Sequence, residues 1–218
     1  MKPSSQSFLR YPLDAIFGKH AYLRVMRTLA SHGGEMSSID VAARAMLSKP
    51  SVLGALDHLA NIGIIEALGS GRSRVYRIDT KHPLVPPISA MFAAEHERFK
   101  SILDAVRAAV ATADVAASWL YGSVARGEDR VDSDFDVVLI NRHKSAVAKT
   151  AVREALDALE DSLRFSASIL DLDAEDVIRL HTTLDPWWMT MSAQAVPLTG
   201  PDPASFVSKL MAGKGSQD

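Results

Sequence analysis

Apolar residues recur at two different spacings along this 218-residue chain, and the spacing predicts where helices and strands lie. Recurrence every three or four residues indicates an amphipathic helix, whereas short alternating or continuous apolar runs indicate strands. Helices are predicted over residues 17–31, 37–45, 48–61, 88–111, 146–163, 174–183 and 203–211. Strands are predicted over residues 64–68, 74–78, 119–121, 134–140, 163–172 and 195–198, so both kinds of element are expected to share the fold.

The first third of the chain carries signals for the ends of short helices. Ser37 or Ser38, and then Ser48, can each cap a helix, and Pro50 fits a first turn, where its missing N–H costs nothing. The residues before the first of these helices, 1–17, are expected to form an extended arm. Three helices followed by a hairpin with a basic GSGRS turn resemble the winged helix-turn-helix modules of MarR- and ArsR-type bacterial regulators.

This resemblance implies that the helix over residues 48–61 lies in the major groove of double-stranded DNA. The residues that it would place at the DNA bases or backbone are Lys49, Ser51, Arg72 and Arg74. His58 is interpreted as a surface residue rather than a specific reader of bases. The alternative is a protein–protein or dimerisation module, because Lys49 is the only Lys or Arg on that helix and Asp57 offsets its charge.

A proline-rich segment, KHPLVPP, separates this module from the rest of the chain. Its prolines deny helix and stiffen the joint, so a linker is predicted there. The long helix that follows is interpreted as a connector or as a surface that pairs two subunits. The second interpretation is favoured, because MarR- and ArsR-like modules read two half-sites as homodimers.

Composition narrows the class of protein. The absence of cysteine excludes disulfides and thiolate metal sites and fits a reducing cytoplasm. No apolar run reaches the roughly 18 residues of a membrane span, and the start of the chain lacks a signal-peptide run, so a cytoplasmic protein with no membrane partner is predicted. Residues 18–82 carry nine Lys and Arg against five acids, and residues 83–218 carry thirteen against twenty. This asymmetry favours two domains with different partners.

The stretch WLYGSVARGEDRVDSDFDVVLI, residues 119–140, carries the candidate chemistry. Asp134 and Asp136 lie two residues apart on one strand, and alternate residues of a strand share a face. Two adjacent carboxylates repel each other, and Mg²⁺ relieves that repulsion while also binding substrate phosphates. Gly122 allows a phosphate to approach the backbone closely, and Ser123 can open a short helix whose free N–H groups favour an anion.

These residues resemble the nucleotidyltransferase superfamily that includes DNA polymerase beta, and GSVARGE followed by SDFDVVL is especially similar to its minimal bacterial branch. The resemblance implies a nucleoside triphosphate substrate whose phosphates are held by Gly122, Ser123 and Arg126. It implies Mg²⁺ bound by Asp134 and Asp136, which would also be catalytic. Arg126 could instead form a salt bridge to Asp132 or Glu128.

The family usually has a third carboxylate on the neighbouring strand, and here the sequence departs from that pattern. Alignment places Ser168 at that position. Asp171 is the nearest strand acid and is the candidate third catalytic residue, but it reaches the site only if the strand shifts or bulges. The adjacent Trp187 and Trp188 could stack on a nucleotide base, although core packing is the favoured interpretation.

The predicted fold class is α/β (α+β) with two domains: a winged helix-turn-helix and a nucleotidyltransferase fold whose small mixed sheet is flanked by helices. The predicted boundaries are residues 1–82 for the DNA-binding domain, 83–112 for the linker and connecting or dimerisation helix, 113–212 for the nucleotidyltransferase-fold domain, and 213–218 for a disordered tail.

Two functions follow from these predictions. The first is an enzyme that transfers a nucleoside monophosphate from an NTP to a hydroxyl, with a protein favoured over RNA or a small molecule as acceptor. The alternative is a DNA-binding transcriptional regulator whose nucleotidyltransferase-like domain is catalytically degenerate and senses nucleotide or dimerises.

Overall fold

The computed structural model describes residues 7–143 and 147–214. Its contacts divide the chain into two compact units. One unit comprises Arg10–Glu97, and the other comprises the described residues up to Leu9 together with those from Arg98 onwards. The long helix α5 (Val85–Ala111) contributes its first part to one unit and its second part to the other. Residues 1–6 and 215–218 lie outside the described residues, so the predictions for them are not assessed. Of the tail predicted over residues 213–218, positions 213 and 214 are instead the end of helix α10 (Pro203–Lys214).

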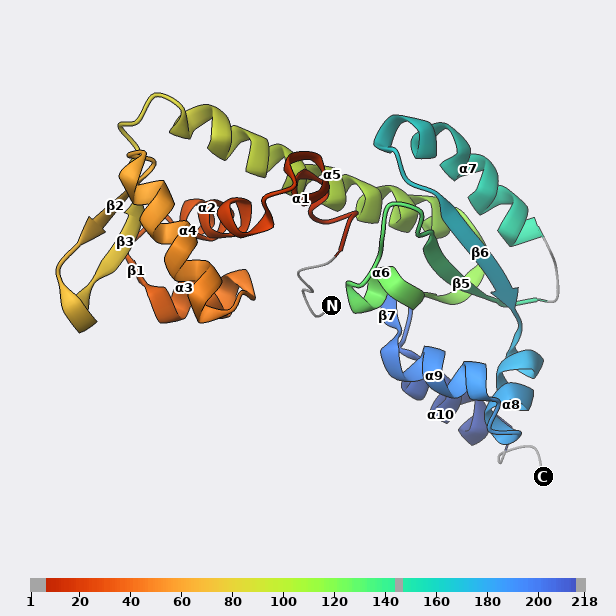
Figure 1. Ribbon diagram of the computed structural model, residues 1–218. Helices are drawn as coiled ribbons and strands as arrows, with labels where there is room; N and C mark the ends of the chain where they lie inside the picture. The colour runs from red at the N-terminus through yellow and green to blue at the C-terminus, as the bar shows by residue number, and fades with distance from the viewer. Residues whose placement is uncertain (1–6, 144–146, 215–218) are drawn as a thin grey trace. The chain divides into compact units, whose positions relative to one another are not determined.

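The first unit contains the three helices and the hairpin that the sequence predicts (Figure 1). Ser37 caps α3 by accepting from the Asp40 N–H, and Ser48 caps α4 by accepting from the Ser51 N–H, as their spacing predicts. The elements of this unit are α1 (Pro12–Phe17), α2 (His20–His32), β1 (Met36–Ser37), α3 (Ser38–Ala45), α4 (Lys49–Asn61), β2 (Ile65–Leu68), the 3₁₀ turn η1 (Gly71–Ser73) and β3 (Val75–Ile78).

The three strands of this unit form one antiparallel sheet in the order β1-β3-β2. The core beneath it is made of apolar residues from α2, α3, α4 and the sheet; its fully buried members include Val25, Leu29, Val41, Val52 and Leu56. This core therefore holds the three helices and the hairpin together as one winged helix-turn-helix arrangement. The two-residue strand β1 is too short to be recognised from its apolar pattern.

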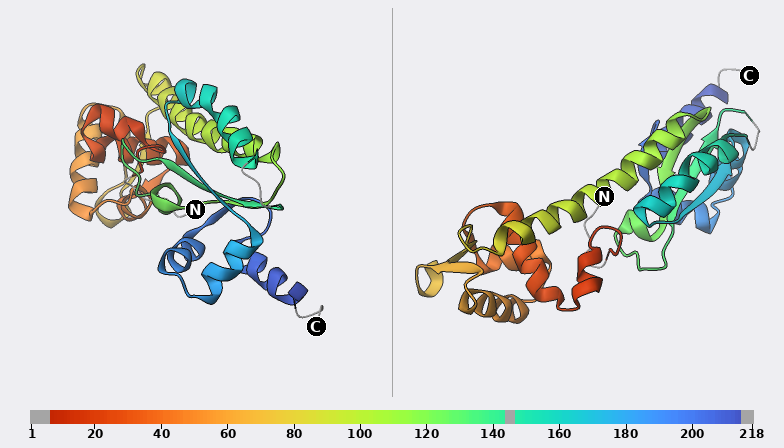
Figure 2. Two further views of the ribbon diagram at one scale, coloured as in Figure 1. Left: turned by 90° about the vertical axis from the view of Figure 1, so that its right-hand side faces the viewer. Right: turned by 90° about the horizontal axis from the view of Figure 1, so that it is seen from above.

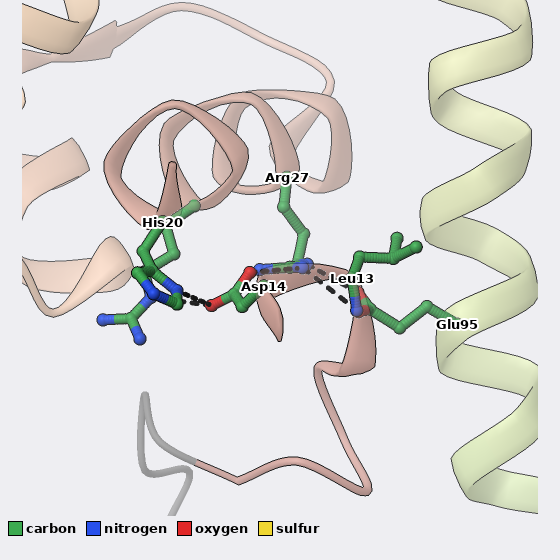
Figure 3. Close-up of polar contacts among 6 residues, drawn as sticks. Leu13, Asp14, His20, Arg27 and Glu95 are labelled. Carbon is green, nitrogen blue, oxygen red and sulfur yellow. Dashed lines mark hydrogen bonds and ion pairs between the residues drawn. The ribbon is translucent and has the colours of Figure 1, made fainter. Parts of the chain in front are cut away.

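A buried ionic cluster holds α1 against α2 and α5 (Figure 3). Arg27 donates from Nη2 to Asp14 Oδ1 over 2.9 Å and from Nε to Glu95 Oε2 over 2.7 Å. Arg24 also donates to Asp14, and the Leu13 N–H donates to Glu95 Oε1 over 3.0 Å. Both carboxylates are buried, so their charges depend on these partners. This cluster corrects the extended arm expected over residues 1–17, because part of that segment is the helix α1.

The second unit is built on a four-stranded mixed sheet in the order β6-β5-β4-β7. Strand β5 (Phe135–Asn141) lies in the middle, antiparallel to β4 (Val115–Leu120) and parallel to β6 (Ala167–Leu172), and β7 (Val196–Thr199) pairs antiparallel with β4. The helices are α6 (Gly122–Arg126), α7 (Val147–Leu163), α8 (Ala174–Thr182), α9 (Pro186–Gln194) and α10 (Pro203–Lys214), besides the second part of α5.

Helices cover both faces of this sheet (Figures 1 and 2). Val137 and Leu139 of β5 pack into a core with α5 and α7, whereas Val138 and Ile140 pack into a second core with α8, α9 and α10. Burial on both faces explains why the β5 sequence is a nearly continuous apolar run. Such a central strand is rigid, so side chains near its start are held in fixed positions.

Two local predictions about helices need correction. The prolines at 86 and 87 lie in the first turn of α5 rather than in a linker, because a first-turn proline lacks only an N–H that has no helical partner. The structure also adds a helix that the apolar spacing does not predict, α9, which Asp185 caps by accepting from the Trp188 N–H over 3.1 Å. Across residues 7–143 and 147–214, no helix combines the length and the apolar character needed to cross a membrane.

Candidate active site at the start of strand β5

The turn between β4 and α6 depends on a glycine. Gly122 has a φ of +71°, and a Cβ at this position would overlap Oδ2 of Asp136. Only glycine adopts this backbone without strain and also leaves room for the carboxylate. The Tyr121 N–H donates to the Asp136 carbonyl over 3.0 Å, so the turn and the start of β5 are joined through the backbone as well.

The two acids of the motif lie beside this turn. Asp134 immediately precedes β5 and is exposed, whereas Asp136 is half-buried. Phe135 and Val137 are fully buried in the core under α5 and α7, so Asp136 points to the opposite face. Burial raises the pKa of Asp136, the charge of Asp134 raises it further, and the Arg126 guanidinium lowers it. The three charged groups are therefore close enough to act on one another.

Arg126 lies in the last turn of α6 and is held by two side chains. Its Nε donates to Glu128 Oε2 over 2.8 Å, and its Nη1 donates to Gln194 Oε1 over 3.1 Å. Of the two salt bridges open to it from the sequence, the structure forms the one to Glu128. These contacts tie α6 to the end of α9 and leave an exposed guanidinium on the side of the turn.

On the neighbouring strand β6, a serine lies beside Asp136, whereas the acidic residue of that strand lies on the other face of the sheet. Asp136 pairs with Ser168 in the parallel ladder between β5 and β6, and paired residues share a face. Asp171 lies three residues further along the strand, opposite Leu139, and its Oδ1 lies 3.4 Å from Lys149 Nζ on α7. The register runs without a bulge, so Asp171 is on the other face of the sheet. The structure thus does not bring it to Asp134 and Asp136, and we do not retain it as a catalytic candidate.

The two adjacent tryptophans differ in burial, because Trp188 lies in the core and Trp187 is partly exposed. Trp188 is 1% exposed and packs edge-on against Trp119 at 6.1 Å between ring centroids. Trp187 is 36% exposed, and its ring lies edge-on to Tyr121 with centroids 5.9 Å apart. Core packing thus holds for Trp188 alone.

Sequence reasoning missed two residues at the edge of this site, Tyr121 and Gln194. Tyr121 directly precedes Gly122, so its proximity to the turn could have been noticed. Gln194 comes from α9, and no local pattern relates it to a turn more than 60 residues earlier. Trp187 is a candidate for base stacking from the sequence, but its position beside Tyr121 is not predicted. Within the described part of the chain, no group of three or more His, Cys, Asp or Glu side chains gathers in a metal-binding arrangement.

The candidate DNA-contacting residues lie on the surface of the first unit. Lys49 and Ser51 are exposed in the first turn of α4, and Ser51 Oγ lies 2.9 Å from Ser48 Oγ. Arg74 is exposed and immediately precedes the returning strand β3 of the hairpin, whereas the position of the Arg72 side chain is outside what the structure describes. His58 stacks on Tyr22 with ring centroids 4.5 Å apart, an intramolecular contact that fits its interpretation as a surface residue.

Both units match known protein families. Residues 22–69 match the family model for the IclR helix-turn-helix domain, and residues 100–175 match the model for the nucleotidyltransferase domain. The first match changes the expected subtype from MarR or ArsR to IclR, which is also a winged helix-turn-helix. A search among curated proteins finds no match to this chain.

Two solved structures are similar to part of the chain. The first, a crystal structure of a toxin-antitoxin with AMP-PNP, has 18% sequence identity over 54% of this chain and 87% of that chain, with a TM-score of 0.35. The second, a mutant of the toxin-antitoxin MntA-HpeT, has 16% identity over the same shares of the two chains and a TM-score of 0.34. By the family models, the chain carries an IclR-type helix-turn-helix domain followed by a nucleotidyltransferase domain.

Proposed function

We propose that this protein transfers a nucleoside monophosphate from a nucleoside triphosphate to a hydroxyl acceptor. The observation that supports this most directly is the position of Asp136, whose carboxylate occupies the space left by the absent Cβ of Gly122, next to Asp134. Two acids beside a glycine turn can hold a cation and the phosphates that it neutralises. In the transfer, the acceptor oxygen bonds to the α-phosphorus, the bond to the bridging oxygen of the β-phosphate breaks, and pyrophosphate leaves as the hydroxyl proton is released.

Mg²⁺ is the metal that fits this site. Its preferred ligands are oxygens, and it is commonly bound by one or two carboxylates together with substrate phosphates and water. Asp134 and Asp136 supply such carboxylates. When bound, the metal would neutralise charge on the triphosphate and the leaving pyrophosphate. The Gly122 turn lies beside both acids, the Ser123 hydroxyl can donate to a phosphate held there, and the exposed Arg126 guanidinium lies close enough to Asp136 to neutralise charge on that side.

The first test measures transfer directly. The full-length chain is incubated with Mg²⁺, each α-labelled NTP in turn and a cell extract, and label is measured in the protein, RNA and small-molecule fractions. We expect label in one fraction, the protein fraction in our proposal, and its loss in Asp134→Asn and Asp136→Asn. Asp132→Asn is the matched control, because Asp132 is an exposed acid of the same loop that no contact places in the site. Label that persists in both aspartate variants would refute the transferase proposal.

A second candidate function is supported by the pairing of Asp136 with Ser168. Without a third carboxylate in that position, the unit could bind nucleotide and metal while transferring nothing, and the protein would then be a nucleotide-sensing regulator. Calorimetric binding of an NTP to the wild-type chain, with no label transferred to any fraction, would favour this function over the first.

We propose further that the helix-turn-helix unit binds double-stranded DNA through α4 and the hairpin. Fluorescence anisotropy against DNA fragments at several salt concentrations tests this, because each lost phosphate contact lowers the salt slope by about one. Lys49→Ala and Arg74→Ala are expected to weaken binding and flatten the slope. Arg142→Ala, which removes an exposed arginine of the other unit, is the control. Binding with the same slope in all four proteins would contradict this surface. We also propose that the protein is a homodimer, as the helix-turn-helix resemblance implies, and sedimentation at the same concentrations tests this.

A further inference from the structure

Among the described residues, an aromatic surface lies beside the acid site and has no role in the proposed function so far. It consists of the rings of Tyr121 and Trp187, which meet edge-on at an interplanar angle of 87°. Tyr121 precedes Gly122 directly, so this surface begins one residue from the turn at which Asp136 lies. Burial raises the pKa of Tyr121, and the charge of Asp136 raises it further, which agrees with a phenol close to the acid.

Trp187 is held in place although its ring is partly exposed. The next residue, Trp188, is buried and contacts Trp119, and its N–H donates to the capping carboxylate of Asp185. At the other end of α9, Gln194 accepts from Arg126. Helix α9 is thus fixed at both ends against the unit that carries the acids, and the Trp187 ring needs little ordering to receive a ligand.

The chemistry of such a surface fits a nucleobase. An exposed indole on an ordered helix offers a flat apolar face, and stacking of a base on an aromatic side chain is a strong, sequence-tolerant interaction. The phosphates of an NTP would lie at the turn and the acids, where the charges are, so the base would have to extend away from them. Tyr121 and Trp187 form the apolar surface continuous with that turn.

We propose that Trp187, supported by Tyr121, is the stacking surface for the base of the bound nucleoside triphosphate. This inference rests on the proposed function, because it assumes that the triphosphate is bound at Gly122, Asp134 and Asp136. Stacking on a single indole favours the larger purine bases over pyrimidines and does not select between adenine and guanine. The substrate class is therefore a purine nucleoside triphosphate.

Calorimetry on the full-length chain with Mg²⁺ tests the proposal, with ATP and inorganic tripolyphosphate as separate probes. Trp187→Ala is expected to weaken ATP binding roughly 10-fold or more, the effect of losing one stacked base, and to leave tripolyphosphate binding unchanged. Trp187→Phe should recover part of the ATP affinity. Met189→Ala, on the same helix and 45% exposed, is the control and should bind both probes as the wild type does.

The possible failures separate the two proposals. If ATP binds equally well to the wild type and Trp187→Ala, or if both probes weaken together, the stacking surface is refuted and the transferase proposal stands. Equal affinity for ATP and UTP in the wild type would refute the purine preference in the same way. If neither ATP nor tripolyphosphate binds the wild-type chain, the proposed nucleotide site itself fails, and the stacking surface fails with it.

Discussion

At the scale of single residues, Gly122 is the position on which the acid site depends most. Its positive φ sets the direction of the chain into α6, and the missing Cβ is the space that Asp136 occupies. A side chain here would have to strain the backbone and displace the carboxylate together. The geometry of the turn and the position of the Asp136 carboxylate therefore both require a glycine at residue 122.

Gly122→Ala is expected to abolish metal-dependent nucleotide binding and to destabilise its unit by about 1–3 kcal/mol, the usual cost of a strained backbone position. Calorimetric titration with ATP and Mg²⁺ and a thermal melt measure the two effects.

The matched control is Gly54→Ala on α4, where an added Cβ has nothing within 4 Å and φ is not in the left-handed region. It should raise stability by about 0.5–1 kcal/mol, because alanine favours helix over glycine. Normal nucleotide binding by Gly122→Ala would show that the carboxylate moves away at no cost, and would contradict the geometry described.

The arrangement of the site's residues could be predicted from the sequence only where those residues are close together in it. Gly122, Asp134 and Asp136 lie within one short stretch, and the structure brings them together. Trp187 and Gln194 reach the same place through the packing of α9, which depends on the buried Trp188 and on its contact with Trp119. Such contacts follow from the assembled core and not from any local pattern.

At the scale of elements, α1 is held to α2 and α5 by buried charges. Burial raises the pKa of Glu95, the Arg27 charge and the Leu13 N–H lower it in part, and the Asp14 charge raises it. The net direction is upward, so the folded chain keeps a proton on Glu95 at pH values where the unfolded chain has released it. This contribution to stability is complete below the ordinary glutamate pKa and is lost as pH rises through the raised pKa.

Glu95→Gln removes this titration. The difference in unfolding free energy between wild type and variant is expected to be most favourable to the wild type in acid and to decline as pH rises from about 4 through the raised pKa. Urea unfolding of both proteins at a series of pH values measures it, and the titration of Asp14 largely cancels because both proteins contain that residue. A difference that instead grows with pH would mean that the ion pair with Arg27 outweighs burial.

The spacing of apolar residues and the capping residues at helix ends predict most elements correctly. Caps such as Ser37 and Ser48 are recognisable in the sequence because they hydrogen-bond within the first turn of their own helix. The errors have physical reasons too. The prediction of an extended arm over residues 1–17 is wrong because α1 is stabilised by partners on α2 and α5, up to 82 residues away in sequence. The sequence places the start of α5 at residue 88, after the prolines at 86 and 87, whereas the helix begins at Val85 because prolines are tolerated in a first turn.

At the scale of the whole molecule, the chain contains separate cores. Leu56 is fully buried in the core of the helix-turn-helix unit, and Leu156 is fully buried in the core between the sheet and α7. We propose that the two units unfold as distinct cooperative steps, in line with the different partners that their opposite charges suggest.

Leu56→Ala and Leu156→Ala are a matched pair for this proposal. Each is expected to destabilise its own unit by about 2–5 kcal/mol, as deletion of a buried leucine usually does. Differential scanning calorimetry should show a lower transition temperature for one step in each variant, and a different step in the two. A single transition that both substitutions lower equally would contradict independent units.

The path of the chain has a consequence for dissecting the protein. Leu9 is 2% exposed in the core under the four-stranded sheet; its N–H donates to Asp129 over 2.7 Å, and its carbonyl accepts from Arg98 over 3.1 Å. The helix-turn-helix unit therefore interrupts the other unit in sequence instead of preceding it. A fragment cloned from residue 98 onwards to isolate the nucleotidyltransferase domain would leave a cavity where Leu9 packs. A fragment that keeps this core joins the segment around Leu9 to the helix at Arg98 through a short synthetic linker.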